Sequence, residues 1–255
     1  MAQKDDARLA LACLDLTSLN EGDDAAAIDA LCARAVTRWG AVAAVCVWLR
    51  FVAQARAALP REVAVAAVAN FPQGALDAQL AVADTRAIVE AGGDEVDLVL
   101  PWRAMLDGRG AEAAQLVAQV REACMGKRLK LIIESGELPT PAAIREACTV
   151  GLDTGVDFLK TSSGKTAHSA TLEAAREMLQ AIAAHPRGAA VGFKASGGIR
   201  SVADAAGYIA LVRDILGPAA LNSARLRFGA SSLLGDIERM LSGGAAMANG
   251  KPTGY

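Results

Sequence analysis

The sequence predicts an α/β protein, a single closed (β/α)8 barrel of the TIM type. Short apolar runs rich in β-branched residues alternate with longer stretches of helical period, which is the pattern of repeated βα units with parallel strands. Eight such units occupy about 240 residues, close to the usual length of a closed barrel. No Pro/Ser-rich linker or low-complexity tract divides them. A doubly wound open sheet is the alternative that the same pattern allows.

Eight segments have the length and composition of buried strands, and a helix candidate follows each one. The strands are expected at residues 11–16, 41–47, 63–70, 94–100, 128–134, 156–160, 189–194 and 226–230. The helices are expected at residues 24–38, 50–59, 77–91, 110–125, 141–154, 171–184, 202–216 and 232–241. Several helices carry capping signals, such as Thr140 before Pro141, and Ser201 with Asp204 three residues later.

The domain boundaries follow from the composition along the chain. Residues 1–242 form the predicted barrel, because Ala-rich segments of similar texture continue as far as the last helix. Residues 243–255, GGAAMANGKPTGY, differ in composition and are expected to form a flexible C-terminal tail.

Composition and charge narrow the classes of ligand to small molecules. A formal net charge of −2 gives no electrostatic reason to expect a nucleic acid or an anionic membrane as a partner. The longest apolar run, residues 39–49, is too short to cross a bilayer, and the polar start MAQKDDAR lacks a secretory apolar core, so we expect a cytoplasmic protein. Five cysteines without C-x-x-C spacing and only two histidines predict neither disulfides nor a metal site.

The alternation of side chains along each strand sends five ionisable residues into the barrel interior. Each is flanked by residues that point outward toward the helices. The five are Asp15, Asp97, Lys130, Lys160 and Lys194. Burying a charge is costly unless it is paired, so sequences rarely place this many inside a barrel for stability alone.

Two interpretations of this cluster are open. Asp97 can pair with Lys130 or Lys194 as a purely structural ion bridge. Three lysines against two aspartates favour the second interpretation, because a surplus lysine near another ammonium group in a desolvated pocket has a lowered pKa. Its free amine is then a nucleophile toward carbonyl carbons, and Lys160 is the expected Schiff-base lysine.

The junctions after the last three strands are rich in glycine and hydroxyl side chains: SSGK (162–165), SGGIR (196–200) and GASS (229–232). Glycine lets the backbone approach an anion, and free N–H groups at helix N-termini donate to phosphate. Lys165 or Arg200 would add positive charge. A reactive lysine beside a phosphate site predicts aldolase chemistry on a sugar phosphate, with a protonated imine as the electron sink and Asp97 moving protons.

Six motifs stand in order along residues 11–234: LDLTSLN, DEVDLVLP, LKLIIESGEL, FLKTSSGK, GFKASGGIR and FGASSLL. Together they resemble the deoxyribose-phosphate aldolase family. The resemblance implies a class I aldolase that interconverts 2-deoxy-D-ribose 5-phosphate with D-glyceraldehyde 3-phosphate and acetaldehyde, in deoxyribonucleotide catabolism. It also implies that no metal or organic cofactor takes part, and that the protein is a homodimer.

The resemblance implies roles for individual residues. Lys160 matches the Schiff-base lysine, Lys194 the second lysine that perturbs its pKa, and Asp97 the aspartate of a proton relay. Tyr255 matches a tail tyrosine that enters the site and assists proton transfer. The positions that resemble the phosphate-binding loops are Gly164, Lys165, Gly197, Gly198, Gly229, Ser231 and Ser232. The positions that resemble the substrate pocket or its polar network are Asp15, Thr17, Cys46 and Lys130.

The chain departs from the family after the second strand, where WLRF replaces the commoner Tyr-Pro-Arg-Phe, so Trp48 and Leu49 alter the predicted pocket mouth. Two other functions are open. Another Schiff-base lyase, such as a transaldolase, fits the lysine but predicts other motifs at the strand ends. A non-catalytic sugar-phosphate-binding barrel would keep the glycine-rich loops, yet it has no need of both Lys160 and Lys194.

Overall fold

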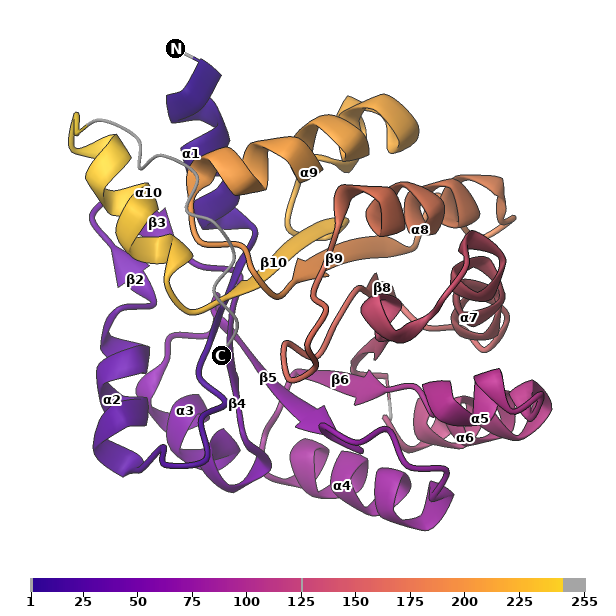
Figure 1. Cartoon of the computed structure of the whole chain (residues 1–255). Helices are drawn as coiled ribbons and strands as arrows, with labels where there is room; N and C mark the ends of the chain where they lie inside the picture. Colours follow the sequence, from indigo (N-terminus) through magenta and orange to yellow (C-terminus); the bar gives the residue numbers. More distant parts are fainter. Residues whose placement is uncertain (1, 125, 245–255) are drawn as a thin grey trace.

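The computed structural model describes residues 2–124 and 126–244, and parallel strands form a closed barrel at its centre (Figure 1). Among these residues the eight barrel strands are β1 (Leu14–Thr17), β4 (Ala44–Val47), β5 (Ala64–Ala69), β6 (Glu95–Val99), β7 (Arg128–Ile132), β8 (Phe158–Lys160), β9 (Gly192–Ser196) and β10 (Leu226–Ala230). Strand β1 closes the ring by pairing with both β4 and β10. This closure confirms the predicted (β/α)8 barrel and rules out the open sheet.

At least one helix follows each barrel strand and lies outside the ring (Figure 1). Thr140 accepts a hydrogen bond from the Ala143 amide at 3.1 Å, and Ser201 and Asp204 form a capping box at the next predicted start signal. The caps satisfy amides that a first helical turn leaves unpaired, and they confirm these predicted starts. The helices are α2 (Ala25–Ala33), α3 (Val52–Ala58), α4 (Ala78–Glu90), α6 (Gly110–Ala123), α7 (Pro141–Asp153), α8 (Leu172–Ala184), α9 (Val202–Leu216) and α10 (Leu233–Leu241).

The prediction of the first strand was wrong at its start. Residue 11 belongs to an additional helix, α1 (Ala2–Ala12), which packs against α9 and α10. Its buried residues Ala7, Ala10 and Leu11 recur with helical spacing, and this was the signal that the prediction missed. The strand itself begins at Leu14.

The other additional elements are short. They are the antiparallel pair β2 (Val36–Thr37) and β3 (Gly40–Ala41), helix α5 (Trp102–Leu106), and the 3-10 turns η1 (Leu49–Phe51), η2 (Ser135–Glu137) and η3 (Pro218–Ala220). The β2–β3 hairpin explains why the helix predicted for residues 24–38 ends at Ala33. Strand β3 begins at Gly40 with a φ of 130°, a conformation that glycine adopts without strain.

Strand β9 begins later than the predicted residue 189 because the Arg225 side chain binds the backbone carbonyls of the residues before it. The Arg225 guanidinium donates to the Gly188 carbonyl at 2.8 Å and to the Val191 carbonyl at 2.9 Å. These bonds hold the preceding residues in a turn, so the strand starts at Gly192 and extends to Ser196.

The strands of the barrel separate the large apolar cluster outside from the charged side chains inside. Outward side chains such as Val96, Leu98 and Leu159 join the large apolar cluster between strands and helices. Phe158 points inward, where Gly192 leaves room for it, since a Cβ on Gly192 would lie 2.3 Å from the ring. The predicted alternation of inward and outward residues is therefore present, and the interior is free to hold the charged groups.

Helix α10 ends at Leu241, and most of the predicted tail, residues 245–255, lies outside the described residues. The tail therefore stays a prediction. None of the helices in the described ranges is both long enough and apolar enough to span a bilayer.

Candidate active site

The five ionisable side chains predicted to point inward meet inside the barrel. Asp15, Asp97, Lys130 and Lys194 are fully buried, and Lys160 is 2% exposed. The parallel register brings them together, because Lys130 lies opposite Asp97 on the neighbouring strand and Lys160 lies opposite Lys194. Local alternation and ring closure thus build one charged cluster from five strands.

Asp97 is the shared acceptor of three ammonium groups. Its Oδ1 accepts a hydrogen bond from Lys130 Nζ at 2.7 Å, and its Oδ2 accepts from Lys160 Nζ at 2.8 Å and Lys194 Nζ at 2.7 Å. Burial alone would raise the pKa of Asp97, but the three ammonium groups outweigh burial and hold that pKa well below its usual value. Asp97 is therefore ionised and bonded to all three lysines.

The cluster contains two further charged residues that the sequence analysis missed. A carboxylate oxygen of Glu95 lies 2.6 Å from Lys130 Nζ, and the Arg227 guanidinium lies 2.6 Å from Asp15 and 2.9 Å from Glu95. Both residues are almost fully buried. Glu95 stands two residues before Asp97 and shares its face of the strand. The alternation that predicts an inward Asp97 therefore also predicts an inward Glu95.

The three lysines differ in the charges around them. Lys194 donates to Asp15 at 2.5 Å as well as to Asp97, and these carboxylates outweigh burial and raise the pKa of Lys194. The pKa of Lys130 is raised in the same way by its carboxylate partners. For Lys160, burial lowers the pKa more than Asp97 raises it, and the adjacent Lys194 ammonium group lowers it further.

These differences mark Lys160 as the candidate nucleophile. A lysine with a lowered pKa presents more free amine at neutral pH, and that amine attacks carbonyl carbons. The Lys160 side chain is also 3% exposed where the side chains of Lys130 and Lys194 are 0% exposed. The direction of the shift agrees with the sequence-based reasoning, although burial contributes more than the second lysine.

Thr17 and Cys46 lie opposite each other at the carboxyl ends of β1 and β4. Thr17 Oγ1 donates to the Asp15 carbonyl at 2.8 Å, which anchors the end of β1. Cys46 is buried, and burial raises the pKa of its thiol, so the thiol stays protonated. Trp48, where the chain departs from the family pattern, donates from Nε1 to the Asn20 carbonyl at 3.0 Å.

The three glycine-rich junctions come together at the carboxyl ends of β8, β9 and β10. A Cβ on Gly197 would lie 2.8 Å from Ser169 Oγ and 3.7 Å from Gly164 Cα, so the loops after β8 and β9 are in contact. A Cβ on Gly229 would lie 2.8 Å from Ser196 Oγ, so β10 approaches the same place. Glycine at these positions is what lets the backbones come this close.

The other residues predicted to bind phosphate are exposed at the same end of the barrel. They are Lys165, Gly198, Ser231 and Ser232. Tyr255 lies outside the described residues, so its predicted entry into the site stays a prediction. Within residues 2–124 and 126–244, His, Cys, Asp and Glu side chains form no group of three or more arranged to hold a metal ion.

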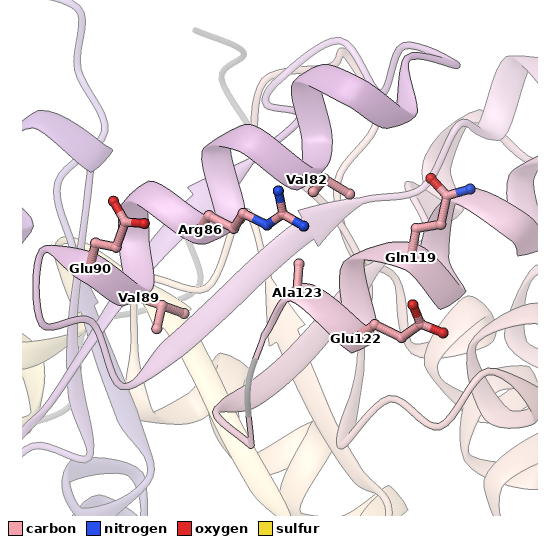
Figure 2. Close-up of a pocket in the computed structure, with 7 residues that line it drawn as sticks. All are labelled: Val82, Arg86, Val89, Glu90, Gln119, Glu122 and Ala123. Atoms are coloured by element: carbon pink, nitrogen blue, oxygen red, sulfur yellow. The ribbon is translucent and has the colours of Figure 1, made fainter.

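A surface groove of about 480 Å³ lies apart from this cluster, between α4 and α6 on the outside of the barrel (Figure 2). Arg86 extends into the groove from α4, and Gln119 and Glu122 line it from α6. No residue of the charged cluster lines the groove, so it is not the predicted site.

The sequence matches a known family over most of its length. The family model described as DeoC/LacD family aldolase covers residues 9–234. The chain belongs to this family of aldolases. Among the relatives of this DeoC/LacD aldolase, the deoxyribose-phosphate aldolase of Agrobacterium fabrum is 46% identical over 241 residues, which are 93% of this chain and 92% of that protein.

Solved structures share the barrel of this DeoC/LacD family aldolase. An apo-form protein of Toxoplasma gondii ME49, provisionally identified as a deoxyribose-phosphate aldolase, has a TM-score of 0.87 at 23% identity over 95% of this chain and 98% of its own. The tetrameric deoxyribose phosphate aldolase of Aeropyrum pernix has a TM-score of 0.73 at 21% identity over 94% and 96%. At these identities the likeness establishes the fold.

Proposed function

We propose that this chain catalyses the reversible cleavage of 2-deoxy-D-ribose 5-phosphate into D-glyceraldehyde 3-phosphate and acetaldehyde through a Schiff base on Lys160. One observation carries the proposal: among the three buried lysines, Lys160 has the lowered pKa, and it ends the strand that leads into the glycine-rich loops. Family membership and the 46% identity to a deoxyribose-phosphate aldolase support the same activity.

The Lys160 amine attacks the C1 aldehyde of the open-chain sugar, and loss of water gives a protonated imine. Removal of the proton from the C3 hydroxyl breaks the C2–C3 bond and releases D-glyceraldehyde 3-phosphate. The electron pair of that bond moves into the imine and leaves an enamine on Lys160. Protonation at C2, followed by addition of water, releases acetaldehyde and restores the amine.

Asp97 moves protons in this sequence, directly or through a water molecule. Its Oδ2 lies 2.8 Å from Lys160 Nζ, the atom on which the imine is proposed to form. Burial and, after it, the Lys194 ammonium group keep the pKa of Lys160 low, while Lys130 holds Asp97 in place and Asp15 holds Lys194. The protonated imine is the electron sink, so the proposed reaction includes no metal or organic cofactor.

The phosphate of the substrate is proposed to bind where the loops after β8, β9 and β10 meet. Backbone amides of glycine-rich loops at helix N-termini suit an anion, and Lys165 would add a positive charge. The residues proposed for this role are Gly164, Lys165, Gly197, Gly198, Gly229, Ser231 and Ser232. Thr17 and Cys46 are proposed to line the pocket on the side of β1 and β4.

Four points stay predictions from the sequence: a cytoplasmic location, a homodimer, a role in deoxyribonucleotide catabolism, and proton transfer by Tyr255.

Deletion of Tyr255 is expected to slow proton exchange on acetaldehyde more than it weakens binding of the phosphate ester. An equal loss in both measurements contradicts the role of the tail and indicates a folding defect.

Borohydride trapping with acetaldehyde tests the proposed function, with peptide mass spectrometry to locate the ethylated lysine. Modification confined to Lys160 is the expected result. Absence of an adduct, with the sugar phosphate still bound, contradicts the aldolase and supports a non-catalytic sugar-phosphate-binding protein. Modification of another lysine contradicts the assignment of the nucleophile.

A further inference from the structure

Glu134 is a buried carboxyl group that the proposed reaction does not use. It follows β7, it is fully buried, and its backbone has a left-handed conformation with φ 52° and ψ 55°. This conformation is uncommon for a residue other than glycine, and burial raises the pKa of the carboxyl group although the hydrogen bonds it accepts lower it, so desolvation is a second cost. Two costs at one residue indicate a function that outweighs them.

The carboxyl group of Glu134 holds the loop that follows β8. The Ser163 amide donates to Oε1 at 3.1 Å and to Oε2 at 3.3 Å. The Thr166 hydroxyl lies between two acceptors, Oε1 at 3.4 Å and the closer His168 carbonyl at 3.1 Å. The loop is therefore fixed at two points, one before and one after Gly164 and Lys165.

The backbone around Glu134 also fits against this loop. The Ser135 amide donates to the Thr161 carbonyl at 2.9 Å. A Cβ on Gly136 would lie 2.3 Å from the His168 carbonyl oxygen, so a side chain at position 136 would push the loop away. The turn after β7 and the loop after β8 therefore behave as one packed unit.

Between its two anchors the loop is open to solvent. Gly164 and Lys165 are exposed, and among the described residues none beyond the chain neighbours of Gly164 has an atom within 4 Å of the place that its Cβ would occupy. Neither residue bonds to Glu134 in the hydrogen bonds described above. A carboxylate repels a phosphate, so Glu134 does not act on that group directly and acts instead through the shape of the loop.

We propose that Glu134 is a positioning residue for the phosphate end of the substrate. By holding Ser163 and Thr166, its carboxyl group presents residues 164 and 165 to the phosphate. The inference rests on the proposed function, because that function assigns this loop to phosphate. It places the effect of Glu134 on phosphate recognition and not on imine formation.

The test compares steady-state kinetics of Glu134 variants on 2-deoxyribose 5-phosphate and on unphosphorylated 2-deoxyribose. Glu134→Ala removes the acceptor of the Ser163 amide and is expected to raise KM for the phosphorylated sugar about tenfold. The kcat/KM for the unphosphorylated sugar is expected to stay within about twofold of the parent value. The inhibition constant of inorganic phosphate is expected to rise by the same factor as KM.

Two further variants separate the position of the acceptor from its charge. Glu134→Gln retains an acceptor oxygen at the same reach and is expected to keep KM within about twofold of the parent value. Glu134→Asp keeps the charge but is one methylene shorter, so its oxygens withdraw from Ser163 and KM is expected to rise. This pair also covers the case in which Glu134→Ala fails to fold. Glu137→Gln, on the same turn, is the matched control and is expected to leave both substrates unaffected.

Equal losses on the two sugars overturn the inference, because they show a general structural role. Unchanged KM in both Glu134→Ala and Glu134→Asp overturns it as well. Acetaldehyde carries no phosphate, so borohydride trapping of the unsubstituted chain tests the proposed function independently. Failure to label Lys160 there refutes the aldolase, whereas normal labelling with an unchanged KM in the variants refutes only the role of Glu134.

Discussion

The interior of the barrel and the loops at its mouth are built from different kinds of residue. The interior places the ammonium or guanidinium groups of Lys130, Lys160, Lys194 and Arg227 against three carboxylates, at distances set by strand register. The loops place glycines and hydroxyl groups against backbone, as where Gly197 meets Ser169. The contrast agrees with the proposed division, in which the strands carry the chemistry and the loops recognise phosphate. Substitutions inside should alter turnover, pH dependence and stability, and those at the mouth should alter KM.

The largest effect is expected from Lys160→Leu, which removes the proposed nucleophile. Turnover should be abolished in the aldol cleavage assay. The fold should survive, because burial lowers the pKa of Lys160 and its charge is therefore no net source of stability. Circular dichroism and the melting temperature check the fold. Appreciable residual cleavage activity in a folded variant contradicts the assignment.

The next largest effect concerns stability. Glu95→Gln leaves Arg227 and Lys130 buried with one carboxylate fewer, and the free energy of unfolding should fall by about 3–5 kcal/mol. Arg227→Gln should be costly for the complementary reason, since Asp15 and Glu95 each lose one cationic partner. Urea unfolding measures both losses.

The double variant Glu95→Gln with Arg227→Gln sharpens this prediction. It removes the pair together, so its loss of stability should be smaller than the sum of the two single losses. Additive losses would show that the 2.9 Å contact between these residues contributes no coupling.

Lys194→Leu should shift the pH dependence of kcat/KM. The Lys194 ammonium group lowers the pKa of Lys160, so its removal raises that pKa and reduces the free amine at neutral pH. The rising limb of the profile should move to higher pH by about one unit, with about tenfold lower activity at neutral pH. Lys165→Met, in the loop, is the control and should not move the limb. An unchanged profile in Lys194→Leu argues against the coupling.

The smallest effect is expected at the mouth. Gly197 has a φ of 89°, and a Cβ there would lie 2.8 Å from Ser169 Oγ, so Gly197→Ala should displace the loop. KM for 2-deoxyribose 5-phosphate should rise about threefold to tenfold, with a stability loss of about 1 kcal/mol. Adding Ser169→Gly should recover part of the KM by restoring space. A fall in kcat at constant KM would contradict the proposed division of roles between strands and loops.

Local alternation was sufficient to predict the charged interior, because the direction of a strand side chain depends only on its place in the strand. The same rule also predicts that Arg227 points inward, because it stands two residues before the inward Gly229. Alternation does not identify partners. Asp15 and Lys194 are 179 residues apart and are brought together by the closure of β1 on β10 and of β10 on β9.

The loops were less predictable, because their contacts depend on how separate turns fit in space. Glycine and serine content located the three junctions, but nothing local indicated that Gly136 would pack on the carbonyl of His168. Glu134 was missed for a similar reason. Its left-handed backbone departs from the alternation of β7, and its partners lie on the next loop of the barrel.

The fit of Phe158 against Gly192 has a consequence for the order of events in the proposed reaction. The ring lies inside the barrel two residues before Lys160, and the guanidinium groups of Arg128 and Arg227 each lie 5.7 Å from its centroid. The interior is filled on that side, so sugar and fragments exchange through the opposite opening. The two-carbon fragment is still covalently attached when D-glyceraldehyde 3-phosphate forms. Acetaldehyde becomes free only after protonation and hydrolysis of the enamine, so covalent attachment to Lys160 retains the two-carbon fragment after D-glyceraldehyde 3-phosphate is free to leave.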